Sequence, residues 1–132
     1  MRRIIPGVLF FAFIIWIIVE ADRGANNIFF DIVRMVPYGD KIGHALVFGL
    51  LTFLAIIAFN NKRIKVFKCR VQLGALLVFG FALLEELTQI FLPNRTFDLV
   101  DICFDIVGIS IFCYTNVWYT KLCLLHVSKV KT

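Results

Sequence analysis

The sequence predicts an all-α fold: a bundle of four transmembrane helices with a short interfacial helix in the first outer loop. Of the 132 residues, 61% are hydrophobic and 17% are charged, whereas soluble domains average about 45–50% and about 25%. Four apolar runs each approach the roughly 20 residues that cross the hydrocarbon of a bilayer. The length suits one domain over residues 1–132.

The first two runs are the least polar. The first follows Arg2 and Arg3 and covers residues 4–19. A signal peptide would need small residues at its cleavage site, and "IIVEADRG" is a poor match, so we expect an uncleaved helix. The second run covers residues 42–59 and is interrupted only by His44 and Thr52.

The third and fourth runs cover residues 71–92 and 99–119. Both are long enough to span a membrane. They hold most of the polar side chains found within apolar sequence: Gln72, Glu85, Glu86, Thr88, Gln89, Asp101 and Asp105.

A short amphipathic segment separates the first two runs. Its apolar residues recur at helical spacing and predict a helix that lies in the outer interface: Ile28, Phe29, Ile32, Val33 and Val36. Pro37 and Gly39 would end it. We expect a tucked loop helix without chemistry of its own rather than a lid.

The distribution of lysine and arginine predicts the orientation. Ten of these residues lie at the N-terminus, in the connection "NNKRIKVFKCR" and in the C-terminal tail, which share one side of a four-span protein. Four lie on the other side: Arg23, Arg34, Lys41 and Arg95. Because basic residues stay on the cytoplasmic side, both termini are expected there.

The net charge of +5 does not indicate a nucleic-acid partner, because the basic residues are separated by apolar runs and form no single stripe. The expected partner is the lipid bilayer. The four cysteines have no CxxC spacing and are read as apolar packing residues. Three of them recur every ten residues along one predicted helix, which excludes a disulfide among those three.

Charged and amide side chains are predicted to meet at one depth near the outer end of the bundle. Asp98, Asp101 and Asp105 share one face of the fourth helix with Gly108. Both Glu85 and Glu86 share a face with Gln89 on the third helix, and Asp40 and His44 share the first turn of the second. Arg95, in the connection "PNRT", is expected to fold back onto Glu86 or Asp101.

Such residues inside membrane spans usually mark a functional site, because isolated charges are costly there. This reading is favoured for His44, Glu86 and Asp101. Asp40, Lys41 and Glu85 are equally well explained as interface anchors or as ion pairs that fix helix register.

The motifs "DKIGH", "EELTQIFLPNRTFDLVD" and "DICFDIVG" resemble those of the VanZ-like family, small bacterial membrane proteins named after a teicoplanin-resistance determinant. The resemblance spans residues 40–108. Its motif positions are occupied by Asp40, Lys41, His44, Glu86, Gln89, Pro93, Arg95, Asp98, Asp101 and Gly108. It implies a multi-pass protein of the bacterial cytoplasmic membrane that acts in the cell envelope or in glycopeptide tolerance.

The chain departs from the family pattern at two positions. Asp105 stands where the family has asparagine, so this group must be either ionised and paired or protonated. Phe112 stands where the family has a second glycine, which predicts different helix packing below the pocket.

Three functions compete. In the first, the pocket binds a lipid-linked wall precursor or a phospholipid headgroup through Asp40, Lys41, Gln89, Arg95, Asp98 and Asp105. In the second, it is a hydrolase or transferase with catalytic candidates His44 (a general base oriented by Asp40), Glu86 and Asp101. A divalent cation on Glu86, Asp101 and Asp105 is compatible with that chemistry. In the third, the cluster only holds a scaffold together.

Overall fold

The computed structural model describes residues 4–24, 28–93 and 95–130, and the protein is 75% helical. Within these residues the chain forms five helices and one two-stranded hairpin. Three of the described helices are long and apolar enough to cross a membrane. They are α1 (Ile5–Asp22), α3 (Gly39–Ala58) and the first 24 residues of α5 (Leu99–Val130).

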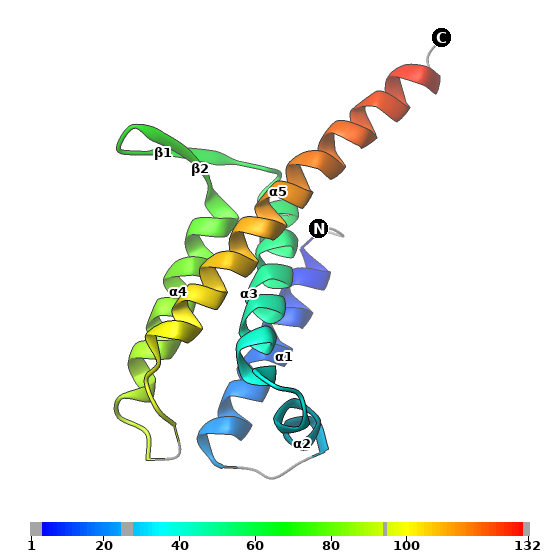
Figure 1. Cartoon of the computed structure of the whole chain (residues 1–132). Helices are drawn as coiled ribbons and strands as arrows, with labels where there is room; N and C mark the ends of the chain where they lie inside the picture. The colour runs from blue at the N-terminus through cyan, green and yellow to red at the C-terminus, as the bar shows by residue number, and fades with distance from the viewer. Residues whose placement is uncertain (1–3, 25–27, 94, 131–132) are drawn as a thin grey trace.

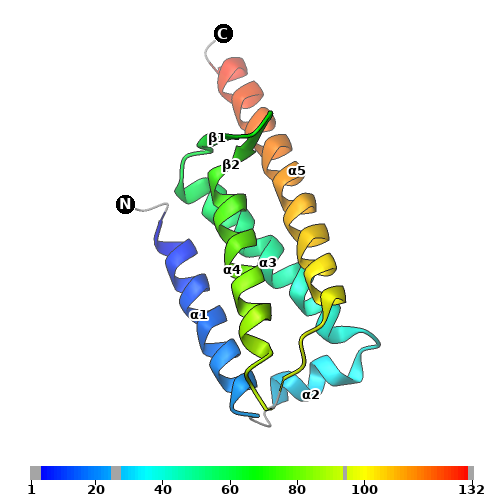
Figure 2. The same cartoon turned by 90° about the vertical axis from the view of Figure 1, so that its left-hand side faces the viewer.

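The long helices and α4 (Leu73–Gln89) run side by side in alternating directions (Figures 1 and 2). We call the end where α1 and α4 finish and α3 and α5 begin the pocket end. The opposite end, which carries the hairpin, is the hairpin end. The predicted up-and-down order of the four apolar runs is therefore present.

Helix α3 lies at the centre of the bundle and packs against α1, α4 and α5. The buried apolar core comes from four helices: Ile14, Phe48, Leu51, Ile56, Ala75, Val78, Ala82 and Ile109. Most other apolar side chains of the long helices are exposed at the outside of the bundle, as expected for surfaces that face lipid.

Two glycines let the helices approach closely. A Cβ at Gly108 of α5 would overlap the Ala45 carbonyl oxygen of α3, and one at Gly74 of α4 would come within 2.6 Å of the Ile56 backbone nitrogen. A Cβ at Gly49 would press on the Phe112 ring, 2.8 Å from Cε2. Phe112 stands where the family has glycine, and the absence of a side chain at Gly49 on the facing helix leaves room for its ring.

Helix α4 is shorter than the run that predicted it. It has 17 residues, about 26 Å at 1.5 Å per residue, and covers 73–89 rather than 71–92. Helix α5 is longer than predicted: it continues to Val130 instead of ending at 119.

A β-hairpin lies between α3 and α4, where only a basic connection was predicted. Strands β1 (Arg63–Val66) and β2 (Cys69–Gln72) pair antiparallel, from Arg63 with Gln72 to Val66 with Cys69. Its turn has none of the usual glycine signals; Phe67 itself adopts a φ of 52°. Val71 and Gln72, expected in the third helix, belong to β2.

Helix α2 (Ile28–Met35) is the short helix predicted in the first loop, and it packs against the start of α3. The chain turns between them with Tyr38 at a φ of 57°. Gly39 then lies against the Val33 backbone, where a Cβ would overlap the Val33 carbonyl. The predicted stop at Pro37 and Gly39 is therefore confirmed.

Candidate functional site

One face of α5 meets the first turns of α3 at the pocket end. The Lys41 Nζ donates to Asp98 Oδ2 at 2.7 Å and to Asp101 Oδ1 at 2.8 Å. His44 Nδ1 lies 3.2 Å from Asp105 Oδ1. The spacing of three and four residues along α5 places these carboxylates in register with lysine and histidine on α3. The predicted polar face is confirmed.

Helix α4 contributes the buried side of the cluster. Glu86 is fully buried, and its Oε1 accepts the Asp98 backbone N–H at 2.6 Å. The Gln89 amide donates to both glutamates, at 2.9 Å to Glu85 Oε1 and 3.2 Å to Glu86 Oε2. The Gln89 amide thus holds the two carboxylates side by side, and the Asp98 N–H bond to Glu86 joins α4 to the segment before α5.

Two predicted contacts are wrong. Arg95 reaches Glu85, with Nη2 at 3.4 Å from Oε1, and not Glu86 or Asp101, because Asp98 and Lys41 already occupy those two carboxylates. Asp40 does not orient His44. Its side chain is 64% exposed and lies 3.7 Å from Lys41. The carboxylate that contacts His44 is Asp105, on the facing helix.

The ion pairs change the proton affinity of the loop carboxylate. The Lys41 ammonium, with help from the Val100 backbone N–H, lowers the pKa of the Asp98 carboxyl below its ordinary value. The ion pair thus favours the charged form of Asp98. Asp98 also caps the start of α5, because its Oδ1 accepts the Val100 N–H at 2.8 Å.

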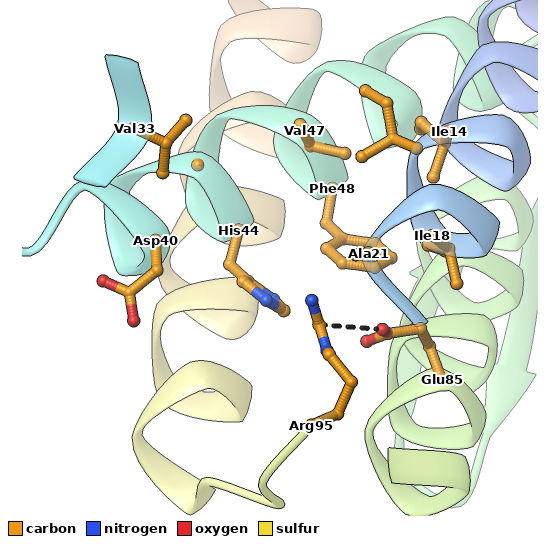
Figure 3. A pocket seen from close by; sticks show the side chains of 12 residues that line it. Ile14, Ile18, Ala21, Val33, Asp40, His44, Val47, Phe48, Glu85 and Arg95 are labelled. Atoms are coloured by element: carbon orange, nitrogen blue, oxygen red, sulfur yellow. Dashed lines mark hydrogen bonds and ion pairs between the residues drawn. The ribbon is translucent and has the colours of Figure 1, made fainter. Parts of the chain in front are cut away.

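A cavity of about 160 Å³ opens beside this cluster. One wall is apolar and comes from α1, α2 and α3: Ile14, Ile17, Ile18, Ala21, Val33, Val47 and Phe48. Figure 3 labels all of these except Ile17. The other side is charged, with His44 and Arg95 directed toward Glu85 and with Asp40 at the start of α3 (Figure 3). The cavity therefore combines a charged region with a lipid-like wall.

Among the described residues, His44, Glu85 and Glu86 form the one set with the geometry to hold a metal ion. One ligand atom from each lies within 4.8 Å of the others. The predicted metal ligands Glu86, Asp101 and Asp105 do not form such a set. Asp101 pairs with Lys41, and Asp105 contacts His44 Nδ1.

Glu85 is the residue that sequence reasoning underrated. The sequence explains it equally well as an interface anchor or as part of an ion pair that fixes helix register. In the structure it is 6% exposed, lines the cavity and contacts both Gln89 and Arg95. The signal was present in its spacing of four from Gln89. A second polar contact was also missed, at the hairpin end, where Gln72 Nε2 lies 3.5 Å from Asn116 Oδ1.

Cys69, Cys103 and Cys113 are free thiols, as predicted, while the side chain of Cys123 lies outside the described residues. Cys69 and Cys103 are exposed. None of these three cysteines is among the residues that line the cavity.

The fold and this site define a helical protein that has three helices long and apolar enough to span a membrane. At one end of its bundle lies a cavity with an apolar wall and a charged side. The VanZ/LLP1 family model matches residues 3–119, so the chain belongs to the VanZ-like family. It is 35% identical over 109 residues to the uncharacterized protein C11E3.10 of Schizosaccharomyces pombe. The match covers 83% of this chain and 62% of the yeast protein, so the chain spans less than two thirds of that relative. No solved structure matches.

Proposed function

We propose that α4 is a fourth membrane span and that both termini lie on the cytoplasmic side, with the pocket end facing outward. Helix α4 packs against α3 and α5 and alternates in direction with its neighbours. Ten of the 14 lysine and arginine residues belong to the termini and the hairpin segment, the arrangement that the positive-inside rule assigns to the cytoplasm.

The orientation is testable with thiols at opposite ends. Cys69 is exposed on the hairpin, and Phe91 is 84% exposed at the pocket end. In a chain whose other cysteines are serine, Cys69 should react with a membrane-impermeant maleimide only after the cells are opened. With Cys69 also replaced, Phe91→Cys should react on intact cells. The reverse pattern would invert the topology.

We further propose that the cavity binds the phosphate-bearing headgroup of a membrane lipid. The observation that carries this proposal is the pairing of an apolar wall on α1 and α3 with Arg95, His44 and Glu85 in one opening. An amphiphile needs both surfaces. At about 160 Å³ the cavity is smaller than the roughly 300–1,000 Å³ of most ligand pockets, which suits a headgroup with its chains left in the bilayer.

The charges favour a particular kind of headgroup. Arg95 touches Glu85 at 3.4 Å through one nitrogen, which leaves guanidinium donors for a phosphate. Glu85 and Asp40 supply acceptors for a headgroup amine or hydroxyl. A phospholipid and a lipid-linked wall precursor share the phosphate. The relative in a fission yeast gives no preference for a bacterial wall precursor, so we favour the phospholipid.

Lipid binding to the purified full chain in detergent tests this proposal. Defined phosphatidylethanolamine and phosphatidylglycerol are titrated and followed by native mass spectrometry. Arg95→Gln should weaken binding about tenfold or more, since a charge-assisted contact to phosphate is worth about 1.5–3 kcal/mol. Glu20→Gln is the matched control: Glu20 is a carboxylate at the same end of the bundle, and its ion-pair partner among the described residues is Arg23. Equal binding by both variants would refute the headgroup site.

The alternative of an acid–base or metal-assisted hydrolase or transferase acting on a lipid-linked substrate retains one specific support, the approach of His44 to two glutamates. Glu86→Gln and Asp101→Asn separate these functions from a scaffold. If the chain confers glycopeptide tolerance, each variant should abolish the phenotype while the protein still folds. Retention of the phenotype by both would exclude a functional pocket, and loss of folding in both would favour the scaffold.

A further inference from the structure

We propose that His44, Glu85 and Glu86 hold a first-row divalent cation, of the Mn²⁺ or Zn²⁺ kind, at the charged side of the cavity. Their ligand atoms lie within 4.8 Å of one another and come from two helices that pack together, α3 and α4. One imidazole and two carboxylates form a mixed nitrogen and oxygen set. Such a set suits Zn²⁺ and Mn²⁺ better than Mg²⁺, which favours oxygen and water.

An unpartnered oxygen points to this ligand independently. Glu85 Oε2 is buried and has no hydrogen-bond partner among the described residues, although the side chain is only 4% exposed. Both neighbours of Glu85, Arg95 and Gln89, contact the other oxygen, Oε1. A buried carboxylate oxygen without a partner is costly, and a cation beside it would remove that cost.

The groups behind the three ligands are those that a metal site needs. Asp105 Oδ1 lies 3.2 Å from His44 Nδ1, which leaves Nε2 to bind the cation. A carboxylate behind a ligating histidine in this way fixes the ring and raises its basicity. Gln89 donates to both glutamates and fixes their separation. The ligands are therefore oriented by buried neighbours instead of by solvent.

The balance of charge supports the same conclusion. The cluster contains two permanently charged bases, Lys41 and Arg95. It contains five carboxylates: Glu85, Glu86, Asp98, Asp101 and Asp105. Lys41 satisfies Asp98 and Asp101, and Arg95 is the base nearest the glutamates. A divalent cation at His44 would offset the remaining negative charge, which is otherwise expensive to bury.

The cation site stands on its own geometry, and only its role in binding a lipid headgroup rests on the proposed function. Three protein ligands leave coordination positions open toward the cavity, as in metal sites that also bind a ligand. A headgroup phosphate oxygen would take an open position while Arg95 binds another oxygen of the same group. The cation and Arg95 together would then distinguish phosphate-bearing lipids from neutral ones.

Mn²⁺ binding to the chelator-stripped full chain in detergent is the direct test, with free Mn²⁺ measured by electron paramagnetic resonance. We expect one saturable Mn²⁺ per chain, displaced by equimolar Zn²⁺ and not by equimolar Mg²⁺. Glu85→Gln should weaken binding at least tenfold, and Asp105→Asn about 10- to 100-fold, the range for losing the partner behind a ligand. Glu20→Gln should bind as the wild type does.

The wild-type chain alone can overturn the inference: the absence of saturable Mn²⁺ binding would show that protons neutralise the cluster. Unchanged affinity in Glu85→Gln would overturn it as well, provided that circular dichroism and gel filtration show a folded monodisperse variant. The two proposals fail separately. Mn²⁺ binding without lipid binding would refute the headgroup proposal and leave the cation site standing. Lipid binding that is unaffected by metal removal would refute a role for the cation in lipid binding and leave the headgroup proposal standing.

Discussion

Gly108→Ala is expected to separate the two helices that carry most of the polar cluster. The added Cβ would overlap the Ala45 carbonyl oxygen and lie 2.7 Å from the carbonyl carbon and 2.8 Å from Cα. These are backbone atoms of α3, which cannot rotate away as a side chain would. Helix α5 must therefore shift outward to restore an ordinary contact of about 3.5–4 Å.

Gly80→Ala is the matched control, because a Cβ at that position on α4 meets nothing within 4 Å. Both substitutions gain the same helix propensity of alanine over glycine, up to about 1 kcal/mol. Only Gly108→Ala also overfills a packed interface, which costs typically about 1–3 kcal/mol. We expect Gly108→Ala to be less stable than Gly80→Ala by an amount in the upper half of that range, since the obstacle is backbone.

Reversible unfolding in mixed micelles with a rising fraction of sodium dodecyl sulfate, followed by far-ultraviolet circular dichroism, measures the difference. A second readout links packing to the site. Lys41 contacts Asp98 and Asp101, and His44 contacts Asp105, across the same pair of helices, so Gly108→Ala should also weaken lipid and Mn²⁺ binding. Equal free energies of unfolding for the two variants would refute the close approach of α3 and α5 at Gly108.

Two further predictions concern the same interface. Gly49→Ala should be destabilising by about 1–3 kcal/mol in the wild type, because the added Cβ would press on the Phe112 ring. In a Phe112→Ala background the same substitution should cost much less. A double-mutant cycle in the same unfolding assay would show no coupling if residues 49 and 112 do not touch. The Lys41 ion pair lowers the pKa of Asp98, so its contribution to stability is present at neutral pH and is lost as pH falls below the ordinary Asp value of 3.8. The difference in thermal midpoint between wild type and Lys41→Met should therefore be constant well above pH 3.8 and shrink as the pH falls below that value. A difference that stays constant on both sides of that pH would contradict the pairing.

The membrane helices were predictable because one property, apolar length, identifies them. Their ends were less so: α4 is 17 residues long and α5 continues to Val130. Polar side chains near a helix end do not show where backbone hydrogen bonding stops. The hairpin was missed for a specific reason. Its turn at Phe67 adopts a left-handed φ without glycine, and Val71 and Gln72 continue the apolar pattern of the next helix.

The faces of the helices that carry the polar cluster followed from helical periodicity. The partners within it did not, because several carboxylates at one depth offered each base more than one choice. Lys41 took two of them, which left Arg95 to Glu85. That competition is decided by distances between helices, and a single sequence carries no measure of those distances.

Asp105 shows how a departure from the family pattern acquires a meaning in three dimensions. The sequence predicted a group either paired or protonated, and the structure supplies the partner, His44, at 3.2 Å. An asparagine oxygen could accept the same Nδ1 proton without adding a charge. A carboxylate in that position is the group that commonly orients a metal-binding histidine, which suits the proposed cation site. The other oxygen of Asp105 is buried without a hydrogen-bond partner among the described residues, so His44 is the partner that the carboxylate has there. The replacement therefore acts on His44, the residue that faces the cavity.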